Sequence, residues 1–583
     1  MIKQLARCVR EYKLPSFLSA LFVTLEVVME VLIPFEMADM LDKGINAGNM
    51  DAVIKSGITL LIYACLTILF GNLAGRAAST ASCGFGKNLR HDMYYNIQNF
   101  SFSNIDKFST SSLITRMTTD VQNVQMAYQM LVRMAFRSPI MMVFSTVFAF
   151  RIYPKLAMVF VLCLPFISGG LYLIMRKTHP IFKRVFKTYD TLNRTVQENL
   201  RGIRVVKSFI REEHESDKFD ATSESIRRDF THAETNIAWN GPLMQICSYA
   251  CMLIVSWLGT QAIIASGNNP DLGLTTGMLM SLITYSMQIL MSVMMISVLF
   301  VMITISRESA ERFCEVLAEE SDLKNCEHPI YEVADGSIKF EHVFFKYSEK
   351  SEKTCLDDVC LDIKSGETVG ILGGTGSSKS TLDQMIPRLY DVTEGSVLVG
   401  GKDVREYDLE ALRDSVAMVL QKNVLFSGTV KENLLWGNEH ATQEEIEHAC
   451  ELAQAAPFIN EMPEGYDTYI EQGGANVSGG QKQRLCIARA LLKKPKVLIL
   501  DDSTSAVDTK TDALIRKAFA EEIPDTTKII IAQRVSSVQD ADKIIILDAG
   551  KIVAMGKHEE LLETSDIYRE VYESQMKGGL SDE

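Results

Sequence analysis

The sequence lacks an excess of positive charge, which limits what the protein can bind. Its formal net charge is -14 at pH 7. General nucleic-acid binding depends on clustered Lys and Arg that neutralise phosphates, so a nucleic-acid partner is excluded. The 12 cysteines are scattered and include no CxxC pair. This pattern fits reduced thiols better than a disulfide framework or a zinc framework.

We also expect no cleavable signal peptide. The opening "MIKQLARCVREYKLP" is basic and amphipathic, and the first apolar run has no small-residue cleavage site after it. The 583 residues exceed one compact domain, and a mean hydropathy of +0.08 with 47% hydrophobic residues is high for a soluble protein. Long apolar runs fill the first half only. We therefore expect an all-α membrane domain over 1–320 and a soluble α/β domain over 331–583.

Six apolar segments are long enough to cross a bilayer, which takes ~20 residues per helix. The connections between them alternate between long and short, and the long ones carry most of the Lys and Arg. Together with the basic N-terminus, this predicts that the long loops and both termini face the cytoplasm. The long loops read as helical hairpins that turn near 111–121 and 210–219, either as solvated hairpins or as docking elements. The predicted spans are 17–37, 57–75, 134–153, 156–175, 242–265 and 277–305.

Two features of these spans are candidates for contact with cargo. Glu26 and Glu30 lie four residues apart, hence on one helix face, and ionisable groups inside a membrane are costly and often functional. The alternative is a pair buried against polar neighbours. The last span carries a stripe of methionines, whose flexible side chains suit varied apolar ligands but also serve plain packing. The methionines are Met280, Met287, Met291, Met294, Met295 and Met302, of which Met287, Met291 and Met295 are the favoured cargo contacts.

The second half contains a phosphate-binding loop. The strand "GETVGIL" (366–372) runs into "GGTGSSKST" (373–381) and then into a helix. Backbone N–H groups of such a loop and the helix N-terminus attract phosphates. Lys379 would reach the outer phosphates, and the hydroxyl of Ser380 would bind Mg²⁺. The P-loop pattern is nearly complete, but Ser378 stands where its last glycine belongs.

Further motifs follow in a fixed order. The apolar strand "KVLILDD" (496–502) ends in acid, which supplies a second Mg²⁺ ligand at Asp501. Between this strand and the P-loop lies "NVSGGQKQR" (476–484). Here the sequence resembles the ATP-binding cassette family, and with six spans ahead of the cassette the whole chain resembles a half-transporter of the exporter type.

The resemblance assigns roles to individual residues. It makes Tyr347 the aromatic that stacks on adenine, Gln421 a link between the metal site and the membrane domain, and "SAVD" (505–508), ending in Asp508, the loop at the dimer seam. It implies that two chains pair around two ATP molecules and that the loop tips dock on the cassettes. The ATP-binding residues are then Gly373, Gly374, Thr375, Gly376, Ser377, Ser378, Lys379, Ser380 and Thr381. The Mg²⁺ ligands are Ser380, Gln421 and Asp501. The signature motif, which serves the ATP of the partner chain, is Val477, Ser478, Gly479, Gly480 and Gln481.

Two positions depart from the family pattern. Asp502 stands where the family has a catalytic Glu, and its side chain is shorter by one bond, about 1.5 Å. Gln533 stands where the family has a switch histidine, and an amide carries no proton at neutral pH. These departures predict the degenerate-site subunit of a heterodimeric exporter. The methionines and carboxylates of the spans favour hydrophobic or amphipathic cargo, and the compact half-transporter favours a bacterial plasma membrane. The alternatives are a nucleotide-gated regulatory subunit that does not hydrolyse ATP, and a homodimeric exporter that tolerates both changes.

Overall fold

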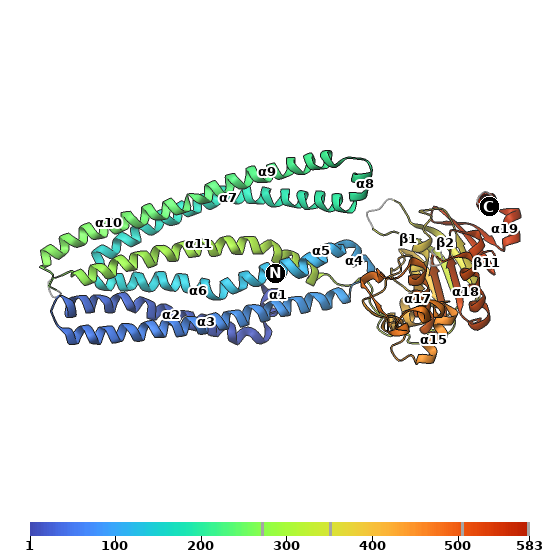
Figure 1. Cartoon of the computed structure of the whole chain (residues 1–583), viewed down its shortest axis with the longest axis horizontal. Helices are drawn as coiled ribbons and strands as arrows, with labels where there is room; N and C mark the ends of the chain where they lie inside the picture. Colours follow the sequence, from blue (N-terminus) through green and yellow to red (C-terminus); the bar gives the residue numbers. More distant parts are fainter. Residues whose placement is uncertain (270–272, 349–352, 503–506, 580–583) are drawn as a thin grey trace. The chain divides into compact units, whose positions relative to one another are not determined.

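The computed structural model describes residues 1–583 except 270–272, 349–352, 503–506 and 580–583. The chain divides into two compact units. The first comprises Met1–Gln98 and Thr110–Glu319, and the second comprises Asn99–Ser109 and Glu320–Glu583. The short segment Asn99–Ser109 therefore belongs with the C-terminal unit, although both of its flanks belong to the N-terminal one. Figure 1 shows the course of the chain.

The first unit is a bundle of long helices, of which six are long and apolar enough to cross a membrane within the described part of the chain. Each predicted span coincides with one of them, so the prediction of six spans is confirmed. The helix α2 packs against α3 and α6, and α6 also packs along α11. The six helices are α2 (Lys13–Asp39), α3 (Met50–Gln98), α6 (Val121–Ile152), α7 (Pro154–Arg201), α10 (Asn240–Ser266) and α11 (Thr276–Ala318).

Further helical elements connect these helices. In Figure 1, α8 lies at the end of the hairpin formed by α7 and α9. The connecting α-helices are α1 (Ile2–Arg7), α4 (Phe102–Phe108), α5 (Thr110–Thr115), α8 (Ile203–Ser208) and α9 (Glu212–Ala238), and the other helical turns are η1 (Arg10–Tyr12), η2 (Met40–Ile45) and η3 (Arg116–Asp120).

The turning points of the two hairpins come earlier than the sequence predicted. The first reversal lies at α4 rather than at 111–121, because Ser101 caps α4 in a reciprocal pair of hydrogen bonds with Asn104. The second lies at α8, which follows the break at Gly202. The predicted segment 210–219 contains only the last residues of that turn and the start of α9 at Glu212.

The described part of the second unit contains two large sheets and a two-stranded one. One is antiparallel, in the order β2-β1-β4-β5, and the other has the order β12-β11-β3-β10-β9-β6 and is parallel except for β12. The antiparallel strands are β1 (Ile338–Phe345), β2 (Leu356–Ile363), β4 (Glu394–Val399) and β5 (Lys402–Asp403). The strands of the larger sheet are β3 (Thr368–Leu372), β6 (Val416–Val419), β9 (Val497–Asp501), β10 (Thr527–Ile531), β11 (Lys543–Asp548) and β12 (Lys551–Gly556), and a small pair is formed by β7 (Gly428–Thr429) and β8 (Tyr469–Ile470).

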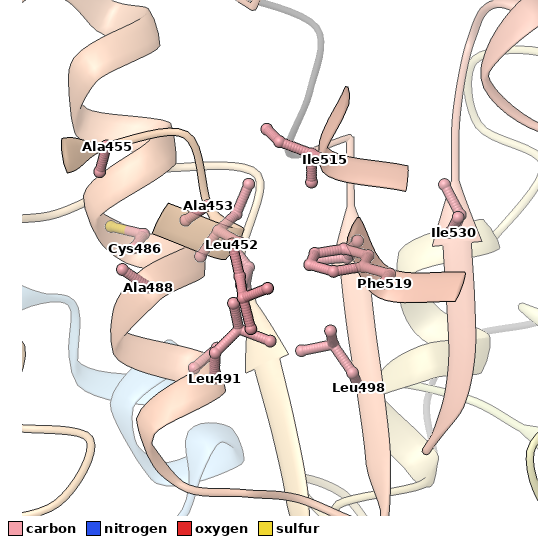
Figure 2. Packing of buried hydrophobic residues seen from close by; sticks show 14 of the residues in the cluster. Leu452, Ala453, Ala455, Cys486, Ala488, Leu491, Leu498, Ile515, Phe519 and Ile530 are labelled. Carbon is pink, nitrogen blue, oxygen red and sulfur yellow. The ribbon is translucent and has the colours of Figure 1, made fainter. Parts of the chain in front are cut away.

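Helices cover the larger sheet and enclose its core. Figure 2 shows Leu491 of α17, Leu498 of β9 and Phe519 of α18 pointing toward one another, all of them buried. The α-helices of this unit are α12 (Lys379–Met385), α13 (Leu409–Ser415), α14 (Val430–Leu435), α15 (Gln443–Leu452), α16 (Ala456–Glu461), α17 (Gly479–Leu492), α18 (Thr509–Glu522), α19 (His558–Thr564) and α20 (Asp566–Gly579). The short 3₁₀ turns are η4 (Val404–Glu406), η5 (Gly465–Asp467), η6 (Gln472–Gly474) and η7 (Val535–Ser537).

Candidate ATP-binding site

The order of the strands brings the predicted nucleotide motifs to one edge of the larger sheet. The strand β10 lies between β3 and β9, and all three are parallel. Their carboxyl ends therefore meet at the same edge. The P-loop follows β3, Asp501 ends β9, and Gln533 lies two residues beyond the end of β10. Motifs more than 150 residues apart in the sequence thus share one site.

The P-loop folds around the side chain of its lysine. Nζ of Lys379 donates hydrogen bonds to the carbonyls of Gly373 at 2.8 Å and Gly374 at 2.9 Å, and to Oγ of Ser377 at 3.3 Å. Burial lowers the pKa of Lys379, against the opposing influence of Asp501 and Asp502. A Cβ at position 373 would come within 2.3 Å of the carbonyl oxygen of Leu547, so this position accepts only glycine.

The serine that replaces the last glycine of the motif adopts a left-handed conformation. Ser378 has φ 74° and ψ 25° at the start of α12, and its side chain makes no capping hydrogen bond. This region costs a residue with a Cβ about 1–2 kcal/mol and costs glycine nothing. The structure thus keeps the loop shape that glycine favours and carries a backbone strain at Ser378.

The residues expected to bind Mg²⁺ lie together at the P-loop. Asp501 is 4% exposed and lies beside the hydroxyl of Ser380. Burial raises the pKa of Asp501, the charge of Asp502 raises it further, and Lys379 opposes both. A buried carboxyl beside a hydroxyl has the oxygen donors that Mg²⁺ prefers, so these side chains fit the ion. Gln421 follows β6, next to β9, and is exposed at the same edge.

The two residues that depart from the family pattern, Asp502 and Gln533, are hydrogen-bonded to each other. Nε2 of Gln533 donates a hydrogen bond to Oδ2 of Asp502 at 2.8 Å. The backbone on both sides is also held, because the N–H of Asp502 donates to Ile531 at 3.0 Å and the carbonyl of Gln533 accepts from Gln575 at 2.8 Å. The side chain of Asp502, where the resemblance places a catalytic Glu, is therefore hydrogen-bonded to an amide.

Tyr347 lies against the helix that follows the P-loop. Its hydroxyl is 3.0 Å from Oγ1 of Thr381, and the tyrosine side chain as a whole is 49% exposed. The ring meets those of Phe345 and Tyr390 edge-on at centroid distances of 4.8 and 5.3 Å. An aromatic face at the rim of a phosphate-binding loop suits a nucleobase, as the resemblance implies.

The signature motif forms the start of α17. Oγ of Ser478 accepts from the N–H of Gln481 at 3.3 Å, and the N–H of Ser478 donates to Oε1 of Gln481 at 2.9 Å. Val477 anchors the turn in the core and Ser478 is exposed. Asp508 caps α18 by accepting from Thr511. Ser505 and Ala506 of the predicted seam loop lie outside the described residues.

A tyrosine that the sequence did not single out joins this site to α4. The hydroxyl of Tyr390 donates to Oδ2 of Asp106 at 2.8 Å, and its ring lies 6.0 Å from that of Phe102. Oγ of Ser103 also donates to Asp322 at 2.7 Å. The helix α4 is thus fixed to the C-terminal unit by polar and aromatic contacts. In the sequence, the two aromatic residues of this turn, Phe102 and Phe108, could have indicated that it packs against other aromatic side chains.

The cargo candidates in the membrane helices have partners that the sequence analysis did not identify. Arg137 of α6 donates to Oε1 of Glu26 at 2.6 Å and to Oε2 of Glu30 at 2.7 Å. The side chain of Glu26 is 10% exposed and that of Glu30 is 31% exposed. Met287, Met291 and Met295 are 38%, 53% and 37% exposed in the single chain.

These features define a protein with six candidate membrane helices and a phosphate-binding-loop domain, and comparisons with known proteins identify its family. Residues 16–304 match the model of the ABC transporter transmembrane region, and residues 356–505 match that of the ABC transporter. The chain is 34% identical over 97% of both lengths to YfiB of Bacillus subtilis, an uncharacterized ABC transporter ATP-binding protein. The chain belongs to the ABC transporters.

Other similar proteins agree. A Staphylococcus aureus protein whose name provisionally assigns it to multidrug export is 30% identical over 99% of this chain and all of its own. A solved bacterial Atm1-family ABC exporter with ATP bound superposes with a TM-score of 0.80 at 22% identity, over 97% of this chain and 98% of that one. The fold is therefore that of an ABC exporter with a transmembrane and an ATP-binding domain.

Proposed function

We propose that this chain is one half of a heterodimeric, ATP-driven exporter of amphipathic or hydrophobic cargo, and that its own ATP site hydrolyses weakly. The family supports an ATP-hydrolysing transporter, and the multidrug assignment of a relative supports the cargo class. The proposal of weak hydrolysis at this site depends on one observation, the hydrogen bond between Gln533 and Asp502.

The chemistry of that bond explains the expected loss of rate. Asp502 ends about 1.5 Å short of where a Glu carboxylate would reach, and a displacement of ~1 Å can cost a catalytic group on the order of 100-fold. The amide of Gln533 occupies one carboxylate oxygen and offers no titratable proton. Lys379 and Asp501 are retained, so ATP and Mg²⁺ still bind. The site then holds nucleotide without turning it over efficiently.

The intact signature motif points to a second, different chain. Ser478 and Gln481 form the capped start of α17, where the residues Ser478 and Gly479 are exposed, and a helix start suits the ATP held by a partner's P-loop. A chain that keeps the motif for its partner's nucleotide while its own site is weakened fits a pair with one strong and one weak site. The partner is a second half-transporter.

The tip of the second hairpin offers a surface for that partner. The helix α8 has no buried residue, and the neighbouring Phe209 and Ile210 are 73% and 84% exposed. Exposed apolar side chains of this size mark interaction surfaces. We assign this tip to docking on a cassette, and the long loops and both termini to the cytoplasmic side of a bacterial plasma membrane.

The first test is ATPase activity of the chain alone in lipid and then purified with its partner. We expect activity only in the pair, and its loss when the catalytic Glu of the partner is replaced. Brisk turnover by the chain alone, abolished by Asp502→Asn, would establish the homodimeric exporter instead. A pair that binds ATP but hydrolyses none at either site would establish the regulatory subunit.

A further inference from the structure

Three donor groups of different chemistry meet on the exposed face of the antiparallel sheet, away from the ATP-binding residues. Nδ1 of His342 lies 2.7 Å from Oδ1 of Asp358 and 3.6 Å from Sγ of Cys360. The three ligand atoms all lie within 4.8 Å of one another, and all three residues are exposed. We propose that His342, Asp358 and Cys360 bind a divalent transition metal ion of the Zn²⁺ type.

Irregular pairing of β1 with β2 creates this arrangement. The ladder pairs Phe340 with Leu361 and Val343 with Val359, so two residues of β1 lie opposite Cys360. A second register shift, between Val343 and Phe345, places an extra residue on β2 beside Asp358. Each shift is a β-bulge, which re-aims the side chains of its strand.

The backbone conformations confirm that both bulges are tightly bent. His342 has φ 49° and Asp358 has φ 54°, in the left-handed region that residues with a Cβ seldom adopt. Val343 directly follows His342 and Val359 directly follows Asp358, and both valines point into the core and are fully buried. The strands are thereby fixed from below, and the three donors are held together on the opposite face.

The geometry fits tetrahedral zinc with one open position. Bond lengths of about 2.0–2.3 Å to N, O and S imply separations between ligand atoms of about 3.3–3.6 Å. The separation of 3.6 Å between Nδ1 and Sγ already falls there. The distance of 2.7 Å from His342 to Asp358 is that of a hydrogen bond, and it must widen by about half an ångström when the ion takes the place of the proton.

The donor set selects the class of metal. A thiolate and an imidazole favour Zn²⁺ and its neighbours in the first transition series, whereas Mg²⁺ and Ca²⁺ prefer oxygen ligands. This site is thus chemically separate from the Mg²⁺ site expected at Ser380 and Asp501. Lys551 forms its ion pair with Asp357 at 2.9 Å, and its charge also acts on the neighbouring Asp358.

The experiment uses the full-length chain in lipid, stripped of metal and titrated with Co²⁺. Binding through Cys360 produces the absorption of a thiolate–cobalt bond, which a site of oxygen ligands lacks. We expect this band in the wild-type protein and in Cys326→Ser, a control at another exposed cysteine. We expect Cys360→Ser to abolish it and His342→Asn to weaken Co²⁺ binding about tenfold or more.

A second measurement needs no variant. Zn²⁺ bound to the thiolate should slow alkylation of Cys360 about tenfold or more, while the rate at Cys326 stays unchanged. Mass spectrometry of the labelled peptides distinguishes the two cysteines. Absence of the cobalt band in the wild type, equal loss in Cys326→Ser and Cys360→Ser, or equal alkylation rates with and without Zn²⁺ would each overturn the metal site.

Discussion

Tyr390 donates a hydrogen bond of 2.8 Å to the carboxylate of Asp106, and the edge of the same ring meets Tyr347 at 5.3 Å. One side chain thus contacts both the aromatic expected to stack on adenine and the short helix α4. Burial raises the pKa of Tyr390, so its hydroxyl remains a proton donor throughout the physiological range. If nucleotide binding moves Tyr347, Tyr390 would transmit this movement to Asp106.

Tyr390→Phe removes this hydroxyl and keeps the ring. We expect ATP affinity to change less than twofold, while cargo-stimulated ATPase of the assembled transporter falls several-fold, because a hydrogen bond to a carboxylate contributes about 1 kcal/mol or more. Tyr390→Ala, which also removes the ring contact with Tyr347, should lower ATP affinity as well. Equal behaviour of the two variants would contradict a separate role for the hydroxyl.

Restoring the family residues should strengthen the weak site. Asp502→Glu with Gln533→His is expected to raise nucleotide trapping on this chain by about 10–100-fold. Asp502→Glu alone should gain less, because Gln533 still holds the carboxylate and because φ is 49° at position 502, a conformation that Asp tolerates better than Glu. The double variant with Asp501→Asn serves as the control that should trap none. No gain from the double variant would remove the argument for a degenerate site.

Ser378→Gly tests the strain in the P-loop. Glycine adopts φ 74° freely, which favours the folded state, but it also has greater entropy in the unfolded chain. The net result should be a rise of up to about 1 kcal/mol in the free energy of unfolding. ATP affinity should rise a few-fold, because the loop no longer holds a strained residue beside Lys379. Ser377→Gly is the matched control, since the φ of Ser377 is not positive and its hydroxyl accepts from Lys379. That variant should lose stability.

Asp383 makes stability depend on pH. It is 0% exposed, and neither carboxyl oxygen has a hydrogen-bond partner within the described part of the chain. Burial, and after it the charge of Asp501, raise the pKa of Asp383 well above its usual 3.8. The folded state therefore binds the proton more tightly than the unfolded state, and stability is lost as pH rises above about 4 toward the folded pKa.

Asp383→Asn removes this proton linkage. We expect the variant to be more stable than the wild type, by a margin that grows with pH from about 4 upward and reaches about 1–3 kcal/mol. Thermal unfolding measured across that range gives the margin. Asp525→Asn, at an exposed carboxylate of the same unit, should leave the profile unchanged. A margin that stays constant with pH would show that Asp383 does not titrate in this range.

Arg137 forms ion pairs with two carboxylates of the membrane helices, Glu26 and Glu30. Arg137→Met leaves Glu26 and Glu30 without their cation, and breaking a buried ion pair in this way costs about 3–5 kcal/mol. The yield of folded protein should fall, and adding Glu26→Gln and Glu30→Gln should restore it. Transport of cationic and neutral cargo by the restored variant then tests the cargo role. Unchanged preference between the two would assign the triad to packing alone.

Much of this site could be predicted because it rests on local patterns. One strand is followed by the glycine-rich loop and another ends in Asp501. In a parallel sheet both motifs then lie at the same edge, so their proximity could be predicted. The partner of Glu26 could not be predicted, since Arg137 lies 111 residues away and only the packing of α2 on α6 brings them together. The left-handed φ of Ser378 depends on the loop as a whole. The bulges that gather His342 and Cys360 depend on strand register, which alternation of polar and apolar residues does not reveal.

The helix α3 has a mechanical consequence. Its 49 residues contain no proline, in contrast to α2, α6 and α7, which contain Pro34, Pro139 and Pro165. At 1.5 Å per residue the helix is about 74 Å long, more than twice the ~30 Å of hydrocarbon it crosses. Such a rod acts as a lever, and a tilt of ~5° about one end carries the other about 6 Å. Because the chain passes from Gln98 directly into Asn99–Ser109, a tilt of a few degrees in α3 would reach α4 as a displacement longer than one helical turn.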